Sequence, residues 1–233
     1  EGKNAIITGA GSGIGLAIAR RFAAEGAHLG LLEVNEESAE TARAELSSSG
    51  ATVEAIVCDV SRRDSVAGAF ARIDETLGTP QILVNNAGIA HVGNLLDTEE
   101  EDLDRLYAVN VKGVALCSRE AVRRMLENSG GVILNLASIA SHIGLEDRFA
   151  YSMTKGAVWT MTRSIATDYM KKNAHRVQLL AGQIEVLWLA DKKDDARNVF
   201  DSLRWVSGSL QIGTPIFDRL NPIAKQLGYP SDW

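Results

Sequence analysis

Short strands of nearly unbroken hydrophobicity alternate with amphipathic helical segments along most of this chain. Between strands, apolar positions recur at helical spacing, as Ile14 and Ile18 do in "GIGLAIARRFAAEG". Strands that are apolar on both faces are typical of parallel sheets covered by helices on each side. The pattern therefore predicts an α/β fold, a doubly wound parallel sheet, in a single domain spanning residues 1–233. The predicted strands are residues 4–10, 27–34, 52–60, 81–88 and 131–138.

Charge and composition exclude several classes of protein. The 233 residues carry a net charge of −6 and no long basic run, so we expect no nucleic-acid partner and no binding to an anionic membrane. No apolar stretch has the length of a membrane span and no signal peptide is recognisable, which predicts a cytoplasmic location. The two cysteines, Cys58 and Cys117, lie in apolar surroundings and are predicted core residues, and no metal site is expected.

The segment "TGAGSGIG" at residues 8–15 joins the first predicted strand to the first predicted helix. Glycines let the backbone turn tightly and approach a pyrophosphate, while a helix N-terminus supplies free N–H groups and partial positive charge. The spacing is looser than G-x-G-x-x-G, and a plain flexible turn is the alternative. We interpret the segment as a dinucleotide-binding loop formed by Gly9, Ser12, Gly13, Ile14 and Gly15.

Two acidic residues follow the second and third predicted strands. Glu33 lies about 20 residues after the glycines, where a carboxylate would accept hydrogen bonds from the adenosine ribose and repel a 2′-phosphate. Ser12 offers such a phosphate no cation, so both residues predict NAD over NADP, although Glu33 could also be a solvated strand end. Asp59, which precedes Val60, is either a carboxylate that contacts adenine or a helix N-cap, and the residues leave both open.

In "FAYSMTKGAVW", Tyr151 and Lys155 lie one helical turn apart on the same face. A tyrosine, with an ordinary pKa of about 10, is a poor base near neutrality, and a nearby cation favours its phenolate. The pair is therefore predicted to exchange a proton with a substrate. An exposed amphipathic helix that carries both residues by chance is the alternative.

With these residues in place, the sequence resembles the short-chain dehydrogenase/reductase family. The resemblance is also carried by "CDV" at 58–60, "NNAG" at 85–88, Asn110 in "VNVKG" and Ser138 in "LASIAS", in family order to about residue 173. It implies a Rossmann-type fold, a nicotinamide cofactor, and hydride transfer on an alcohol or carbonyl. It also implies that the cofactor is bound by Asp59, Val60, Asn86, Ala87, Gly88, Tyr151 and Lys155.

The resemblance assigns roles to four side chains. Tyr151 is the acid/base, Lys155 tunes it and binds the nicotinamide ribose, Ser138 holds the substrate oxygen, and Asn110 holds a water of a proton relay. Taken singly, Ser138 could merely cap a turn and Asn110 could be an ordinary polar position. Family members are commonly homodimers or homotetramers, so the resemblance implies a homo-oligomer here too.

The substrate and the last part of the chain are less constrained. Polar residues in "SHIGLEDR" favour a secondary alcohol such as a polyol, a sugar or a hydroxy acid. The alternatives are a 3-oxoacyl thioester (acyl carrier protein) reductase of the same family and a non-catalytic NAD-binding sensor or scaffold. Residues 174–233 depart from the family pattern and are expected to form an atypical C-terminal lobe, where the family has its substrate lid and oligomer contacts.

Overall fold

A computed structural model of the protein describes residues 2–128, 130–170, 177–180 and 225–226. The chain divides into two units, Glu1–Ala181 and Gly182–Trp233, and the sheet described below belongs to the first. The expected C-terminal lobe over 174–233 lies almost wholly outside the described residues. It therefore stays a prediction, as does a single domain over 1–233.

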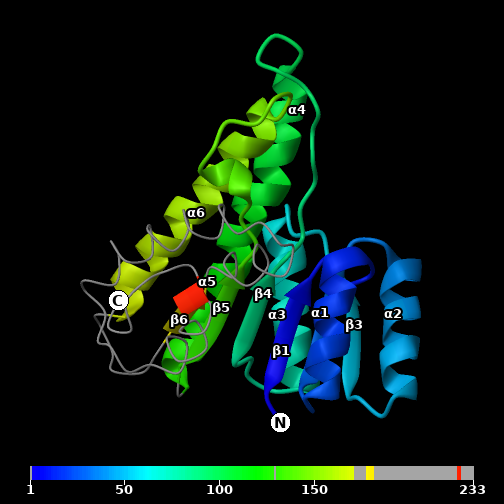
Figure 1. The fold of residues 1–233 in the computed structure, drawn as a ribbon. Helices are drawn as coiled ribbons and strands as arrows, with labels where there is room; N and C mark the ends of the chain where they lie inside the picture. The colour runs from blue at the N-terminus through cyan, green and yellow to red at the C-terminus, as the bar shows by residue number, and fades with distance from the viewer. Residues whose placement is uncertain (1, 129, 171–176, 181–224, 227–233) are drawn as a thin grey trace. The chain divides into compact units, whose positions relative to one another are not determined.

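In the described part of the chain, six strands form one sheet in the order β3-β2-β1-β4-β5-β6 (Figure 1). All five pairings are parallel. The predicted α/β fold with a doubly wound parallel sheet is confirmed, and the strand order reverses between β1 and β4. The strands are β1 (Asn4–Thr8), β2 (His28–Glu33), β3 (Val53–Val57), β4 (Ile82–Asn85), β5 (Gly131–Asn135) and β6 (Val177–Leu180).

Helices connect the strands, so that strand and helix alternate as the apolar pattern predicts. None of the helices within the described ranges is long and apolar enough to cross a membrane. A π-helical stretch, η1, interrupts the long helical segment between β4 and β5. The helices are α1 (Gly13–Ala24), α2 (Glu36–Ser48), α3 (Arg63–Thr76), α4 (Glu100–Leu106), η1 (Tyr107–Gly113), α5 (Val114–Glu127), η2 (Ile139–Ser141) and α6 (Phe149–Met170).

Each face of the sheet has its own apolar core. On β1, Ile6 packs with Phe70 of α3 and other α3 and α5 residues, whereas the next residue, Ile7, packs with Ala42 and Leu46 of α2. Successive side chains of a strand point to opposite faces, so a strand covered on both sides must be apolar at every position. This explains the unbroken hydrophobic runs of the sequence.

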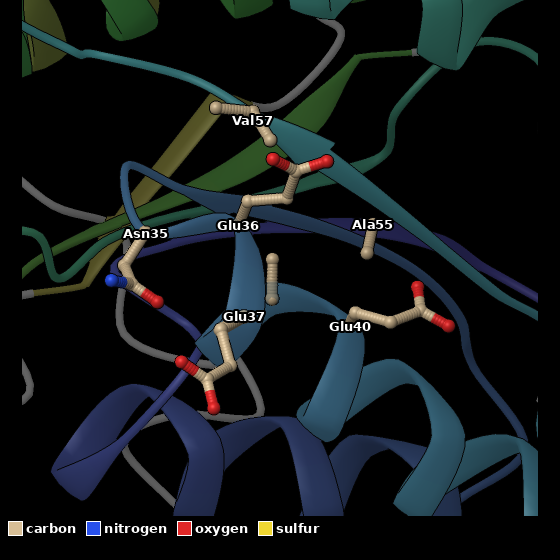
Figure 2. A pocket seen from close by; sticks show the side chains of 7 residues that line it. Asn35, Glu36, Glu37, Glu40, Ala55 and Val57 are labelled. Atoms are coloured by element: carbon tan, nitrogen blue, oxygen red, sulfur yellow. The ribbon is translucent and has the colours of Figure 1, made fainter.

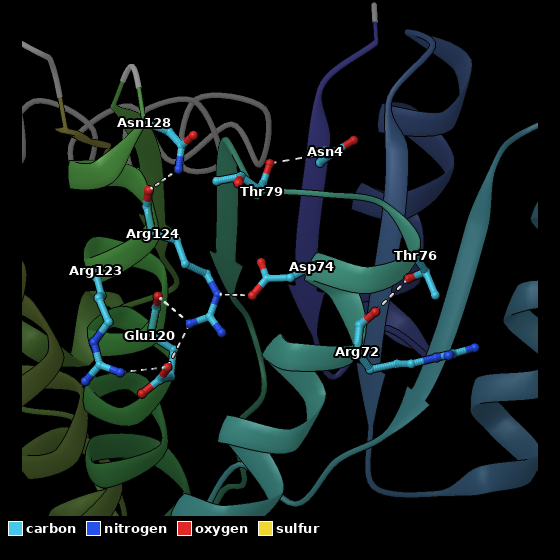
Figure 3. A network of polar contacts seen from close by, with 9 residues as sticks. All are labelled: Asn4, Arg72, Asp74, Thr76, Thr79, Glu120, Arg123, Arg124 and Asn128. Atoms are coloured by element: carbon cyan, nitrogen blue, oxygen red, sulfur yellow. Dashed lines mark hydrogen bonds and ion pairs between the residues drawn. The ribbon is translucent and has the colours of Figure 1, made fainter.

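An arginine joins the two helices that cover one face of the sheet (Figure 3). Arg124 of α5 donates from Nε to Asp74 of α3 at 2.7 Å and from Nη1 to Glu120 at 2.8 Å. Its guanidinium also lies 5.3 Å from the ring centroid of Phe70. Because the Arg124 side chain is largely buried, these contacts are less screened than surface ion pairs and fix α5 against α3.

Both cysteines occupy the predicted core positions. Cys58 and Cys117 are buried and carry free thiols. Burial raises the pKa of each thiol, so both stay protonated near neutral pH and are poor nucleophiles. Among the described residues, no group of three or more His, Cys, Asp or Glu side chains could hold a metal ion.

Candidate active site

The candidate site lies at the carboxyl ends of β1, β4 and β5. The strand order reverses between β1 and β4, and open parallel sheets bind ligands in the crevice beside such a reversal. The loops that follow these three strands contain six of the residues that the sequence motifs single out. These loop residues are Gly9, Ser12, Asn86, Ala87, Gly88 and Ser138.

The glycine loop after β1 is held against the loop after β4. Gly9 has a positive φ of 62° and donates its N–H to the carbonyl of Leu32 at 2.7 Å. A Cβ added at Gly9 would lie 2.9 Å from Cα of Ala87, and one added at Gly15 would overlap the carbonyl oxygen of Gly9. Only glycine fits at both positions. Because no side chain covers the backbone there, a ligand can approach the backbone of this loop closely.

Gly13, Ile14 and Gly15 form the first turn of α1, and Ser12 is its N-cap residue. The Ser12 side chain makes no capping hydrogen bond, so it leaves the first N–H groups of the helix available. Ile14 is 65% exposed, although it is a large apolar residue. A helix N-terminus with unused N–H groups beside an exposed apolar surface fits a dinucleotide pyrophosphate.

Sequence reasoning missed a threonine that joins the two loops. The Thr8 hydroxyl oxygen accepts the N–H of Asn86 at 3.0 Å and that of Ala87 at 2.9 Å. The Asn86 amide donates in turn to the carbonyls of Thr8 and Gly9, both at 2.9 Å. The predicted cofactor residues Asn86 and Ala87 thus lie directly beside the glycine loop. Thr8 was visible in the sequence only as the residue before Gly9.

Glu33, at the end of β2, also holds the glycine loop. Its Oε2 accepts the N–H of Gly11 at 3.0 Å, and its Oε1 accepts the N–H groups of Val34 and Asn35 at 2.9 and 3.3 Å. An ionised carboxylate has about four acceptor sites, so Glu33 can accept a further hydrogen bond. The three backbone donors fix the orientation of that free site.

A recess of about 600 Å³ opens beside the start of α2, next to the end of β2 (Figure 2). Three carboxylates line it, those of Glu36, Glu37 and Glu40, together with Asn35. Arg43 forms an ion pair with Glu40, but Glu36 and Glu37 leave this surface with a net negative charge, which repels a phosphate group. The surroundings of Glu33 are therefore unfavourable to an additional anion.

Asp59 and Val60 follow β3, one capping a turn and the other buried. Oδ1 of Asp59 accepts the N–H of Ser61 at 2.9 Å and its hydroxyl at 2.7 Å. Helix α3 begins only at Arg63, so Asp59 caps the preceding turn and not the helix. Val60 is buried in the core, and a Cβ added at Gly113 would lie 2.9 Å from its Cγ2.

Ser138 comes three residues after the end of β5 and is the N-cap residue of η2. Its hydroxyl oxygen accepts the N–H of Ala140 at 3.2 Å, and its own N–H donates to the hydroxyl of Ser141 at 3.3 Å. Ser138 thus caps a turn, as the alternative interpretation has it, but this cap uses only the hydroxyl oxygen as an acceptor. Because a hydroxyl also donates one hydrogen, that donor is left for another acceptor.

Lys155 is only 7% exposed, which is unusual for a lysine. Its Nζ donates to the carbonyl of Leu136, just after β5, at 2.8 Å and lies 5.8 Å from the ring centroid of Tyr151. Burial lowers the pKa of Lys155 to about 8. The half-buried Tyr151 and this amine are therefore close, so they are not the exposed pair that the alternative reading required.

Asn110 is fully buried in η1 and bonded to the loop after β4. Its Oδ1 accepts the N–H of Ile89, and its Nδ2 donates to the carbonyl of the same residue, both at 2.8 Å. A Cβ added at Gly88 would lie 3.3 Å from Oδ1 of Asn110 and 3.5 Å from Nζ of Lys155. Asn110, Gly88 and Lys155 are therefore neighbours, although they come from three different elements.

Known proteins resemble this chain in sequence and in fold. The family model described as short chain dehydrogenase matches residues 3–195. The 2-(S)-hydroxypropyl-CoM dehydrogenase 3 of Xanthobacter autotrophicus is 40% identical over 163 residues, which cover 70% of this chain and 64% of that protein. A short chain dehydrogenase/reductase from Burkholderia phymatum in complex with NAD has a TM-score of 0.75 and 32% identity. That match covers 77% of this chain and 64% of the other.

An NAD⁺-bound xylitol dehydrogenase gives a TM-score of 0.71 and 34% identity over 72% of this chain and 65% of its own. The chain thus spans somewhat less than two thirds of the length of these three proteins. The family match itself extends over most of the sequence, and the fold is similar to that of solved structures from the same family. This chain belongs to the short-chain dehydrogenase/reductase family of oxidoreductases.

Proposed function

We propose that this protein is an NAD-dependent alcohol dehydrogenase that transfers hydride between a secondary alcohol and the nicotinamide. The observation that carries the proposal is the buried amine of Lys155, bonded to Leu136 and lying 5.8 Å from the ring centroid of Tyr151. Burying an amine is unfavourable, and a protein that only binds a dinucleotide has no need of it beside a phenol. An enzyme that moves a proton at this position does need it.

In the proposed reaction, Tyr151 takes the hydroxyl proton of the alcohol, and the carbon-bound hydrogen leaves as hydride. The bound NAD supplies the hydride acceptor, and the products are a carbonyl compound and NADH. Lys155 stabilises the phenolate of Tyr151 and binds the nicotinamide ribose. The hydroxyl of Ser138, whose hydrogen is not used by the turn that it caps, donates to the substrate oxygen.

Asn110 has the role of supporting proton transfer between Lys155 and solvent. An amide oxygen has two lone pairs, and Ile89 uses only one of those on Oδ1. The other is free for a water near Gly88, where Oδ1 and the Lys155 amine approach each other. This geometry supports a relay, and it assigns Asn110 both a structural and a catalytic part.

NAD is the proposed cofactor, with the glycine loop, Glu33, Asp59, Val60 and the β4 loop as its binding residues. Glu33 presents an oriented acceptor for the adenosine ribose, and the carboxylates of Glu36 and Glu37 repel a 2′-phosphate. Two of the similar structures are described as NAD complexes, which supports the same choice.

Secondary alcohols are the proposed substrates, with polyols, sugars and hydroxy acids as the first to test. The similar proteins include a hydroxypropyl-CoM dehydrogenase and a xylitol dehydrogenase, whose names both indicate alcohol substrates. A homodimer or homotetramer in the cytoplasm is part of the same proposal. Exposed apolar side chains on η1 and α6, those of Tyr107, Phe149 and Met153, support self-association.

The test is a screen of these alcohols with NAD, for the wild type and for Tyr151→Phe. We expect NADH formation by the wild type and a loss of about 10²- to 10⁴-fold in kcat for the variant, the usual contribution of an acid/base. The NAD dissociation constant should change less than about twofold, because the phenol hydroxyl adds little to cofactor binding.

Two outcomes would replace the proposal. If no alcohol gives NADH formation that depends on Tyr151, the protein is an NAD-binding sensor or scaffold. If only NADPH is oxidised, with a 3-oxoacyl thioester as acceptor, the protein is a reductase of the same family. Tight NAD binding by calorimetry would separate the first outcome from a misassigned cofactor.

A further inference from the structure

Thr154 lies directly before Lys155 on α6 and is 1% exposed. Its hydroxyl donates to the carbonyl of Tyr151 at 2.8 Å and accepts the Nδ2–H of Asn110 at 3.1 Å. The single hydrogen of this hydroxyl therefore forms a hydrogen bond within α6, and its oxygen forms one to η1. Both partners are residues to which the proposed reaction assigns a role.

The bond to Asn110 extends to the loop after β4. The Asn110 amide holds both the N–H and the carbonyl of Ile89, so it cannot move without breaking two further hydrogen bonds. The Thr154 hydroxyl thereby ties the first turns of α6 to η1 and to the loop next to Gly88. Without it, a buried amide hydrogen of Asn110 would lack its acceptor, which is unfavourable enough to shift the group.

The same hydroxyl arrangement occurs once more on this helix, further from the site. Thr162 donates to the carbonyl of Val158 at 2.7 Å and accepts from the Asn135 amide at 2.9 Å. It is also buried, at 7% exposed. Thr162 is therefore a matched control, because removing its hydroxyl deprives a buried amide, that of Asn135, of its acceptor, as Thr154→Val does for Asn110.

We propose that Thr154 is a positioning residue for the reaction proposed above, on which this inference rests. Its hydroxyl fixes the turn that carries Tyr151 and Lys155 against Asn110, and so sets the phenol relative to the amine and to the bound cofactor. A displacement of about 1 Å in a reacting group can lower a rate by about 100-fold. The hydroxyl thus contributes to turnover without touching the substrate.

The experiment compares Thr154→Val, which keeps the shape of the side chain but not the hydroxyl, with Thr154→Ser and Thr162→Val. Steady-state kinetics with NAD and the best alcohol give kcat and KM, and thermal unfolding gives stability. We expect Thr154→Val to lower kcat about 10- to 100-fold with a smaller change in KM. Thr154→Ser should stay within about threefold of the wild type, since it retains the hydroxyl.

The pH dependence separates positioning from mere stability. In Thr154→Val, the kcat–pH profile should differ from that of the wild type, because Tyr151 and Lys155 no longer keep their positions relative to each other and to Asn110. Thr162→Val should lose a similar amount of stability and keep the wild-type profile.

The inference is wrong if Thr154→Val keeps the kcat and the pH profile of the wild type. It is equally wrong if Thr162→Val reproduces the changes. Should Thr154→Val fail to fold, Thr154→Cys, of similar size and with a weak hydrogen-bonding thiol, must show the same changes. If the wild type itself has no turnover, the proposed function fails and the inference fails with it, whereas an active wild type whose kcat and pH profile are kept by Thr154→Val refutes the inference alone.

Discussion

The buried amine of Lys155 should make the stability of this protein depend on pH in a way that one substitution removes. Lys155 is 7% exposed, and burial lowers its pKa from 10.5 to about 8. In the unfolded chain the amine returns to water and to its ordinary pKa. Replacing it with methionine, which fills similar space without a charge, deletes this difference.

The sign follows from proton binding. Between about pH 8 and about pH 10.5 the unfolded chain binds more protons at Lys155 than the folded protein, so the free energy of unfolding rises with pH in that window. The destabilisation is complete below pH 8 and is lost above pH 10.5. Its size is about 3 kcal/mol, at about 1.4 kcal/mol for each pH unit between the two pKa values. About 2.5 kcal/mol of it disappears between pH 7 and pH 10.

Urea unfolding without cofactor, at about pH 7 and about pH 10, measures this quantity. The free energy of unfolding of Lys155→Met, minus that of the wild type, should be about 2.5 kcal/mol larger at the lower pH. Groups that titrate in this range and lie away from Lys155 are present in both proteins and cancel. The control is Lys112→Met, at an exposed lysine of η1, for which the difference should be the same at both pH values. A difference for Lys155→Met that is flat, or larger at pH 10, would refute the reasoning.

Two further substitutions test the cofactor loop. Gly15→Ala places a Cβ against the carbonyl of Gly9 and should weaken NAD binding by about 100-fold in calorimetry, whereas Gly68→Ala, where a Cβ has open space, should leave the affinity unchanged. Glu33→Ala removes the acceptor of the Gly11 N–H as well as the proposed ribose contact, so NAD affinity should fall at least about tenfold. NADPH affinity should fall less or rise, and an unchanged ratio between the two cofactors would argue against Glu33 as the selecting residue.

The fold was predictable because a sheet covered by helices on both faces requires apolar side chains at successive positions of a strand. Ile6 and Ile7 must both be apolar when helices cover both faces of β1, and neighbouring apolar residues of β2, β4 and β5 are divided between the two cores in the same way. The sequence could not predict the interruption of the helix at η1, since "YAVNVKG" contains neither proline nor a run of glycines. That π-helical stretch is stabilised in part by the bonds of Asn110 to Ile89, which is distant in sequence.

The place of the candidate site followed from motif order. The carboxyl ends of parallel strands lie at one edge, so Gly9 after β1 and Asn86 after β4 could be expected to meet there, as they do. Ser138 comes after β5 at the same edge. Residue types and spacing were enough to predict this meeting place, because the parallel topology brings the carboxyl ends of the strands to one edge of the sheet.

The partners of these residues were not predictable, because most of them are backbone groups. Lys155 donates to the carbonyl of Leu136, and Glu33 accepts the N–H of Gly11, yet every residue carries a carbonyl and nearly every one an N–H. Only the three-dimensional course of the chain decides which carbonyl or N–H lies next to a given side chain. It follows that Glu33 serves both the loop and the proposed ribose contact, so a substitution there alone should disturb NAD binding more than it reverses cofactor preference. A variant meant to accept NADP must therefore also supply a new acceptor for the N–H of Gly11.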